Sequence, residues 1–172
     1  MDIKCLTILI REFYNMLIRE AKREDSSTIL RFVKELAAYE KAEHEVLATK
    51  EMIESSIFSE HSTTKAIICE SEGNPIGFAV YFFNYSTWLG KHGLYLEDLY
   101  VSPSERGSGA GKALLKHLAG IAVANDCGRF EWSVLDWNKP AIDFYESLGA
   151  KPKSEWLGYQ LTGESLAALA AS

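Results

Sequence analysis

The segment at residues 106–112 reads R-G-S-G-A-G-K, with glycine at every second position from Gly107 to Gly111. It follows a strand-like run at 94–101 and opens a helix-like run at 112–124. Because glycine has no side chain, alternate glycines leave the backbone N–H groups accessible to a ligand. The start of a helix adds free N–H groups and the positive end of its dipole. Together these groups predict a binding site for a pyrophosphate.

This loop departs from two familiar nucleotide-binding loops. The dinucleotide fingerprint G-x-G-x-x-G fails because Lys112 occupies its third glycine position. The P-loop pattern G-x-x-x-x-G-K-[ST] fails because Arg106 replaces its first glycine and Ala113 its final hydroxyl. What remains is R-G-x-G-x-G, and on this motif alone a glycine-rich turn without a ligand stays an alternative.

The elements that must position this loop predict an α/β fold. We expect strands at residues 16–21, 64–70, 76–85, 94–101, 130–135 and 155–161. We expect helices at residues 26–39, 49–58, 112–124, 139–148 and 164–170. Asp25, Ser26 or Ser27 can cap the first of these helices, and Thr49 can cap the second. E-G-N-P at 72–75 predicts a hairpin turn. The order predicts a mixed central sheet flanked by helices, with a right-handed crossover from 94–101 to 130–135.

Bulk properties narrow the class of partner. The net charge of −6 argues against nucleic acid and is compatible with a cationic small substrate, although it also serves solubility. Three cysteines without metal spacing favour a reducing, cytoplasmic location. No apolar run approaches the roughly 20 residues of a membrane helix. We expect residues 1–15 to be an N-terminal extension and 16–172 to be a single domain.

The sequence around the loop adds further motifs. Before it stands Y-L-E-D-L-Y-V-S-P at 95–103, and after it N-K-P-A-I-D-F-Y-E-S-L-G-A at 138–150. In this order, the motifs resemble the GNAT superfamily of N-acetyltransferases. K-E-L-A-A-Y-E at 34–40 and Y-F-F-N-Y-S-T-W at 81–88 make the chain similar to the diamine (spermidine/spermine-type) N-acetyltransferase family. Y-S-T-W at 85–88 and V-L-D-W-N at 134–138 are most similar to its thialysine-preferring branch.

The resemblance implies a GNAT-like acyl-CoA N-acyltransferase fold and transfer of the acetyl group of acetyl-CoA to an amine by direct attack. It implies that Glu97 is a water-assisted base and that Tyr145 is the acid, and a phenol with a pKa of about 10 suits protonation of a thiolate. The implied coenzyme contacts are Leu99, Tyr100, Val101, Arg106, Gly107, Ser108, Gly109, Ala110, Gly111, Lys112, Asn138 and Ala141. No metal is expected, because the four histidines lie far apart in the sequence.

Amine recognition is expected from carboxylates and aromatic faces. The candidates are Tyr39, Glu40, Ser86, Trp88, Glu97, Asp98 and Glu155. On a regular strand Glu97 and Asp98 would face opposite sides, so they would serve different roles. Ser86 stands where the spermidine-type enzymes carry an aspartate, which favours a short lysine-like amine over a long polyamine.

The resemblance also implies a homodimer with amine sites near the subunit boundary. Two alternatives stay open from the sequence. The first is acetylation of a protein or peptide amine, and the second is a non-catalytic acyl-CoA-binding module.

Overall fold

The computed structural model describes residues 16–172, so the expected extension at 1–15 lies outside the described residues. The chain divides into two compact units. The first ends at Ser133 and the second spans Val134–Ser172. The prediction of a single domain over 16–172 stays a prediction.

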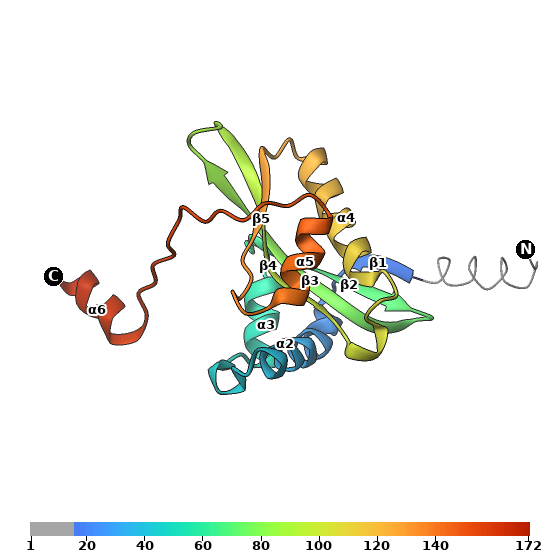
Figure 1. Cartoon of the computed structure of the whole chain (residues 1–172). Coiled ribbons are helices and arrows are strands. Elements are labelled where there is room, and N and C mark those ends of the chain that lie inside the picture. The colour runs from blue at the N-terminus through green and yellow to red at the C-terminus, as the bar shows by residue number, and fades with distance from the viewer. Residues whose placement is uncertain (1–15) are drawn as a thin grey trace, which may run out of the picture. The chain divides into compact units, whose positions relative to one another are not determined.

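The first unit is built on one five-stranded sheet (Figure 1). Its strands, in spatial order, are β1 (Met16–Glu20), β2 (Thr64–Ser71), β3 (Asn74–Ser86), β4 (Lys91–Val101) and β5 (Arg129–Trp132). Neighbours are antiparallel except β4 and β5, which are parallel as the predicted crossover requires. The predicted β2–β3 hairpin is confirmed, and Glu72 and Gly73 both have positive φ, as its tight turn demands.

Within residues 16–133 the structure has three α-helices: α2 (Ser26–Glu40), α3 (Lys50–Ile57) and α4 (Ala110–Ala124). Short 3₁₀ turns are η1 (Arg23–Asp25), η2 (Glu43–Glu45) and η3 (Pro103–Glu105). The predicted cap of α3 is confirmed, since the Thr49 hydroxyl accepts a hydrogen bond from the Met52 N–H at 3.2 Å. Asp25, predicted as a possible cap of α2, instead accepts from the Lys22 N–H and pairs with Arg19 at 2.7 Å.

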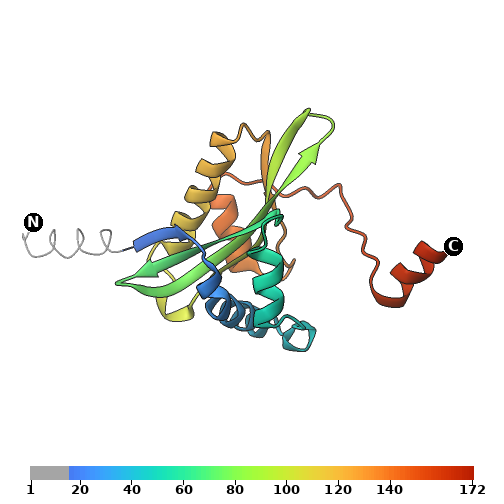
Figure 2. The ribbon, with the colours of Figure 1, turned by 180° about the vertical axis from the view of Figure 1, so that it is seen from behind.

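The sheet buries both of its faces. One face meets α2 and α3, which lie next to each other in Figures 1 and 2. There Phe32 and Phe78 stack with ring centroids 5.4 Å apart, in a cluster that includes Val80 and Tyr100. Side chains alternate across a strand, so the fully buried residues at neighbouring positions, such as Ile67, line the opposite face. In the first unit α4 contacts β1, β3, β4 and β5 and covers that face.

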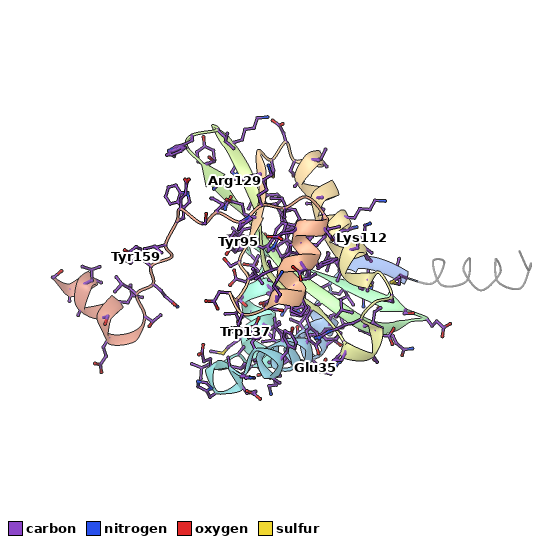
Figure 3. The ribbon with its side chains drawn as sticks, in the orientation of Figure 1. Glu35, Tyr95, Lys112, Arg129, Trp137 and Tyr159 are labelled. Atoms are coloured by element: carbon purple, nitrogen blue, oxygen red, sulfur yellow. The ribbon has the colours of Figure 1, made fainter. Side chains whose placement is uncertain are left out.

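The second unit holds α5 (Lys139–Ser147) and α6 (Gly163–Ala171), with an irregular stretch between them. The strand predicted at 155–161 is wrong, because this stretch forms no strand. Its alternating residues Leu157, Tyr159 and Leu161 are exposed, and the exposed fraction of Tyr159 is 93%. Figure 3 labels Tyr159 on this stretch. A strand needs a neighbour to accept its backbone hydrogen bonds, and this unit contains no strand. Among residues 16–172, no helix has both the length and the apolar character needed to cross a bilayer.

Candidate active site

A β-bulge interrupts β4 at the predicted base. Val80 of β3 pairs with Asp98, whereas Tyr81 pairs with Leu96, so Glu97 is the extra residue of β4. The bulge reverses the alternation of side chains beyond it. Asp98 therefore shares the face of Val80, toward α2 and α3. The expectation that Glu97 and Asp98 point to opposite faces assumed a regular strand, and β4 is not regular there.

Three carboxylates, which we call the acidic cluster, influence one another here: Glu40, Glu97 and Asp98. Burial raises the pKa of Asp98 to about 6, and the charges of Glu97 and Glu40 contribute to the rise. Burial also raises the pKa of Glu40, the last residue of α2. Glu97 itself is exposed. Repulsion among these negative charges is relieved by a cation, so this cluster suits an ammonium group.

The edge of β4 beyond the bulge is open in the first unit. The parallel pairing with β5 covers only Gly93–Leu96, and within residues 16–133 no other strand pairs with that edge at residues 97–101. On the other edge Leu99, Tyr100 and Val101 pair with β3. β5 ends at Trp132, so β4 continues beyond the last position that its parallel neighbour covers. Open backbone groups at such an edge can pair with the amides of an extended ligand.

The glycine loop leads from η3 into α4. Gly107 and Gly109 have φ of +83° and +93°, and a Cβ added at either would meet nothing within 4 Å. Ser108 fixes the turn, since its hydroxyl donates to the Glu105 carbonyl at 2.7 Å. The helix begins at Ala110, slightly earlier than predicted, and Gly111 and Lys112 lie in its first turn (Figure 3). The open space beside first-turn N–H groups fits a pyrophosphate.

Arg106 takes a position that the sequence did not reveal. Its Nε donates to the Val101 carbonyl at 3.1 Å. Its guanidinium carbon lies 4.7 Å from the ring centroid of Tyr39 and 5.7 Å from that of Tyr100. Arg106 thus joins the loop, the end of β4 and the last turn of α2. The predicted phosphate contact of Arg106 stays a prediction.

The β3–β4 hairpin tip lies away from the acidic cluster. Ser86 pairs with Lys91, while Asp98 pairs with Val80, six residues earlier on β3, a separation of about 20 Å along the strand. Ser86 is buried, and its hydroxyl accepts from the Leu89 N–H in the turn. Trp88 is 88% exposed at the tip. One chain therefore brings Tyr39, Glu40 and Asp98 together but does not add Ser86 or Trp88.

The family model for the acetyltransferase (GNAT) family matches residues 16–150. The chain belongs to this family. Thialysine N-epsilon-acetyltransferase of Sus scrofa is 39% identical over 167 residues, covering 91% of this chain and 98% of that protein. Spermidine/spermine N(1)-acetyltransferase-like protein 1 of Homo sapiens is 36% identical over 151 residues, covering 84% of this chain and 22% of that protein. Among solved structures, an integron cassette protein from the mobile metagenome of V. cholerae has 31% identity and a TM-score of 0.78, covering 92% and 99% of the two chains.

Membership in the GNAT family confirms the predicted fold and the predicted acetyltransferase activity. Acetyltransferases of this family use acetyl-CoA. The residues present fit that co-substrate, because the glycine loop offers backbone N–H groups beside open space and β4 offers an unpaired edge.

The second unit of this acetyltransferase carries the remaining candidates. Asn138 is buried and caps α5, and its Oδ1 accepts from the Ala141 N–H at 3.4 Å. Tyr145 is half-buried on α5, with its ring 5.5 Å from that of Phe144. Glu155 is exposed in the irregular stretch. Their roles toward coenzyme and amine stay predictions.

Sequence reasoning missed Tyr95 beside the acidic cluster. Tyr95 pairs in register with Phe82, so it shares the face of Val80 and Asp98. Its ring packs 5.2 Å from that of Phe82, and its hydroxyl lies 2.9 Å from the Ser133 hydroxyl. A regular strand would have placed Tyr95 and Asp98 on opposite faces, so only the bulge explains their common side.

Proposed function

We propose that this acetyltransferase acetylates the primary amine of a small cation of the thialysine or lysine-analogue kind. The observation that carries the proposal is the acidic cluster beside the open edge of β4. Three carboxylates next to a strand edge can hold an ammonium group where an extended thioester would lie. The similarity to thialysine N-epsilon-acetyltransferase supports the same class of substrate.

The proposed mechanism is direct attack of the amine. Glu97 takes the ammonium proton through water, which its exposed position permits, because only the neutral amine has a lone pair. Asp98 and Glu40 bind the remaining positive charge of the substrate. Acetyl-CoA supplies the thioester whose carbonyl carbon is attacked; the new C–N bond forms as the C–S bond breaks. Tyr145 gives its phenolic proton to the departing thiolate, and the second proton that the amide nitrogen loses restores the phenol.

The coenzyme is held by the two features described above. The glycine loop and the first turn of α4 receive the pyrophosphate. The open edge at Leu99, Tyr100 and Val101 pairs with the amides of the pantetheine arm. Lys112, Asn138 and Ala141 are the further contacts that we propose. The two free thiols among residues 16–172, Cys69 and Cys127, support a reducing compartment such as the cytoplasm.

We also propose that the enzyme works as a homodimer. Ser86 and Trp88 lie far from the acidic cluster of their own chain, so they can serve an amine site only across a subunit boundary. The exposed apolar residues of the irregular stretch, such as Leu157 and Tyr159, support burial against a second copy. Light scattering at micromolar concentration tests this point, and a monomer there contradicts it.

The decisive experiment is an amine panel with acetyl-CoA, followed as release of free thiol. Thialysine and lysine are expected to show higher kcat/KM than putrescine, spermidine or spermine. A preference for spermine contradicts the substrate class but leaves the acetyltransferase activity intact. Competition by a peptide library that abolishes small-amine turnover would favour a protein substrate instead.

The variant Ser86→Asp sharpens the same experiment. An added carboxylate should favour polyamines and disfavour a zwitterion, whose own carboxylate it repels. One charge-assisted contact is worth about 1–3 kcal/mol, enough to shift the ranking about tenfold. An unchanged ranking contradicts the role of residue 86. Ser55→Asp, on α3 and exposed, is the matched control.

A further inference from the structure

Arg106 connects the two halves of the proposed site. It is the first residue of the glycine loop, yet its guanidinium lies over Tyr39, which is adjacent in sequence to Glu40 of the acidic cluster. We propose that Arg106 is a positioning residue that couples occupancy of the acyl-CoA loop to the shape of the amine site, acting through the ring of Tyr39. This inference rests on the proposed function and deepens it.

The first step is how Arg106 itself is held. Its Nε donates to the carbonyl of Val101, the last residue of β4. The backbone N–H of Arg106 donates to the Pro103 carbonyl at 3.3 Å. The backbone of Arg106 belongs to the loop, and its Nε is bonded to the end of β4. A shift of the loop relative to β4 therefore disturbs this bond and the position of the guanidinium.

The second step is what the guanidinium touches. The guanidinium carbon stands 4.7 Å from the Tyr39 ring centroid and 5.7 Å from the Tyr100 centroid. Both distances lie within the range of about 6 Å in which a cation is attracted to an aromatic face. Tyr100 is buried in the α2–α3 core, so it provides a fixed wall, whereas Tyr39 belongs to a helix end.

The third step is what the helix end carries. The helix α2 stops at Glu40, because Lys41 adopts φ of +62° and its N–H donates to the carbonyls of Ala37 and Ala38. Last turns of helices fray most readily. Glu40 lies in this turn and is close enough to Asp98 to raise its pKa. A cation over Tyr39 therefore restrains the turn that presents one of the three carboxylates.

Coenzyme in the loop fixes Arg106, and Arg106 fixes the last turn of α2. The amine therefore meets an ordered acidic cluster after acetyl-CoA has bound. A contact that only neutralises phosphate would change affinity for CoA and leave the amine site alone. A phosphate contact alone therefore changes the KM for acetyl-CoA, whereas the coupling also changes the KM for the amine.

A double-mutant cycle tests the coupling at saturating acetyl-CoA. Arg106→Gln is expected to raise the amine KM about two- to fivefold, the range of an exposed cation–π contact, while kcat changes less. In a Tyr39→Leu background the same change should leave the amine KM nearly unaltered. In a Tyr39→Phe background, which keeps the aromatic face, the original increase should return. Equal increases in all three backgrounds overturn the proposal.

Hydrogen exchange gives a second measurement that needs no turnover. Addition of CoA to the parent should slow amide exchange in residues 37–41 and in the first turn of α4. In Arg106→Gln, once CoA is raised to saturation, protection should persist in α4 and disappear from 37–41. Protection of 37–41 that survives in Arg106→Gln overturns the proposal. If no amine is acetylated by the parent, the proposed function fails, and this exchange pattern still decides the coupling.

Discussion

The two ends of β4 differ in how much of a site each makes from its own chain. The end at residues 97–101 holds a bulge, a half-buried carboxylate and an open strand edge, and it runs through η3 into the glycine loop. The end at Lys91 closes a hairpin whose tip exposes Trp88 and buries Ser86 in a turn. One end assembles chemistry from residues near in sequence, and the other presents an exposed aromatic side chain on a hairpin that is held to the rest of the first unit by the Lys91–Asp126 ion pair.

The bulge explains this difference in physical terms. A regular β4 would continue to alternate, and Asp98 would face α4 instead of Glu40 on α2. The extra residue at Glu97 reverses the alternation just where the pairing with β5 stops. A single inserted residue thus turns Asp98 toward the face of Glu40, and the open edge begins at the same point of β4.

The largest effect is expected from removal of the proposed base at residues 97–101 of β4. Glu97→Gln is expected to lower kcat about 10²–10⁴-fold, the usual contribution of a general base, while CoA binding stays near the parent value. Single-turnover thiol release measures the chemical step. Glu60→Gln, at an exposed position away from β4, is the matched control. If the Glu97→Gln variant is fully active while chemistry limits the rate, Glu97 has no part in the mechanism.

The next effect concerns the glycine loop. Gly109→Ala places a methyl group in the open space where phosphate would approach and is expected to weaken CoA binding about tenfold or more. Gly90→Ala is the matched control, because Gly90 also has positive φ and an unobstructed Cβ but lies at the hairpin tip. Calorimetry of CoA binding compares the two. If both variants weakened CoA binding equally, backbone strain and not the loss of a phosphate site would explain the lower affinity.

Local chemistry made much of this fold predictable from the sequence. The turn at Glu72 and Gly73, the cap at Thr49 and the glycine loop are decided within a few residues, and each was located correctly. Features set by distant partners were not predicted. The bulge depends on β3, and the position of Arg106 depends on Tyr39 of α2. The strand predicted at 155–161 failed for the same reason, since alternation alone supplies no neighbouring strand.

At the hairpin end the expected effect is smaller. Trp88→Ala is expected to lower kcat/KM for the amine about two- to tenfold, as loss of an aromatic face toward a cation would. Because the residue would act on the partner's site, mixing Trp88→Ala with the inactive Glu97→Gln chain should restore one intact site per heterodimer. Leu47→Ala, another exposed apolar position, is the matched control. No recovery of Trp88-dependent activity on mixing contradicts a role across the boundary.

A separate effect is expected on stability, and it comes from Asp98. Its pKa of about 6 exceeds the ordinary value of 3.8 because burial and then the charges of Glu97 and Glu40 disfavour the carboxylate. The folded protein therefore binds the Asp98 proton more tightly than the unfolded chain does. Asp98 favours folding most below about pH 4, and this contribution is lost as pH rises through about 6.

Asp98→Asn removes the charge but keeps the shape, so it should raise the free energy of unfolding by about 1–3 kcal/mol at pH 8 and change it little at pH 4. Urea denaturation at both values measures this difference, with the exposed Asp136→Asn as control.

The affinity for the amine should change in the opposite direction to the stability. In the parent it should rise as pH falls below about 6, because a protonated Asp98 no longer attracts an ammonium group, and in Asp98→Asn it should be higher at pH 8 and lose that step. A variant that is more stable yet binds the amine as tightly as the parent would show that the Asp98 carboxylate does not take part in substrate recognition. A variant that is more stable and binds the amine more weakly shows that the Asp98 carboxylate lowers the stability of the folded protein. It also shows that attraction to the bound cation offsets this loss.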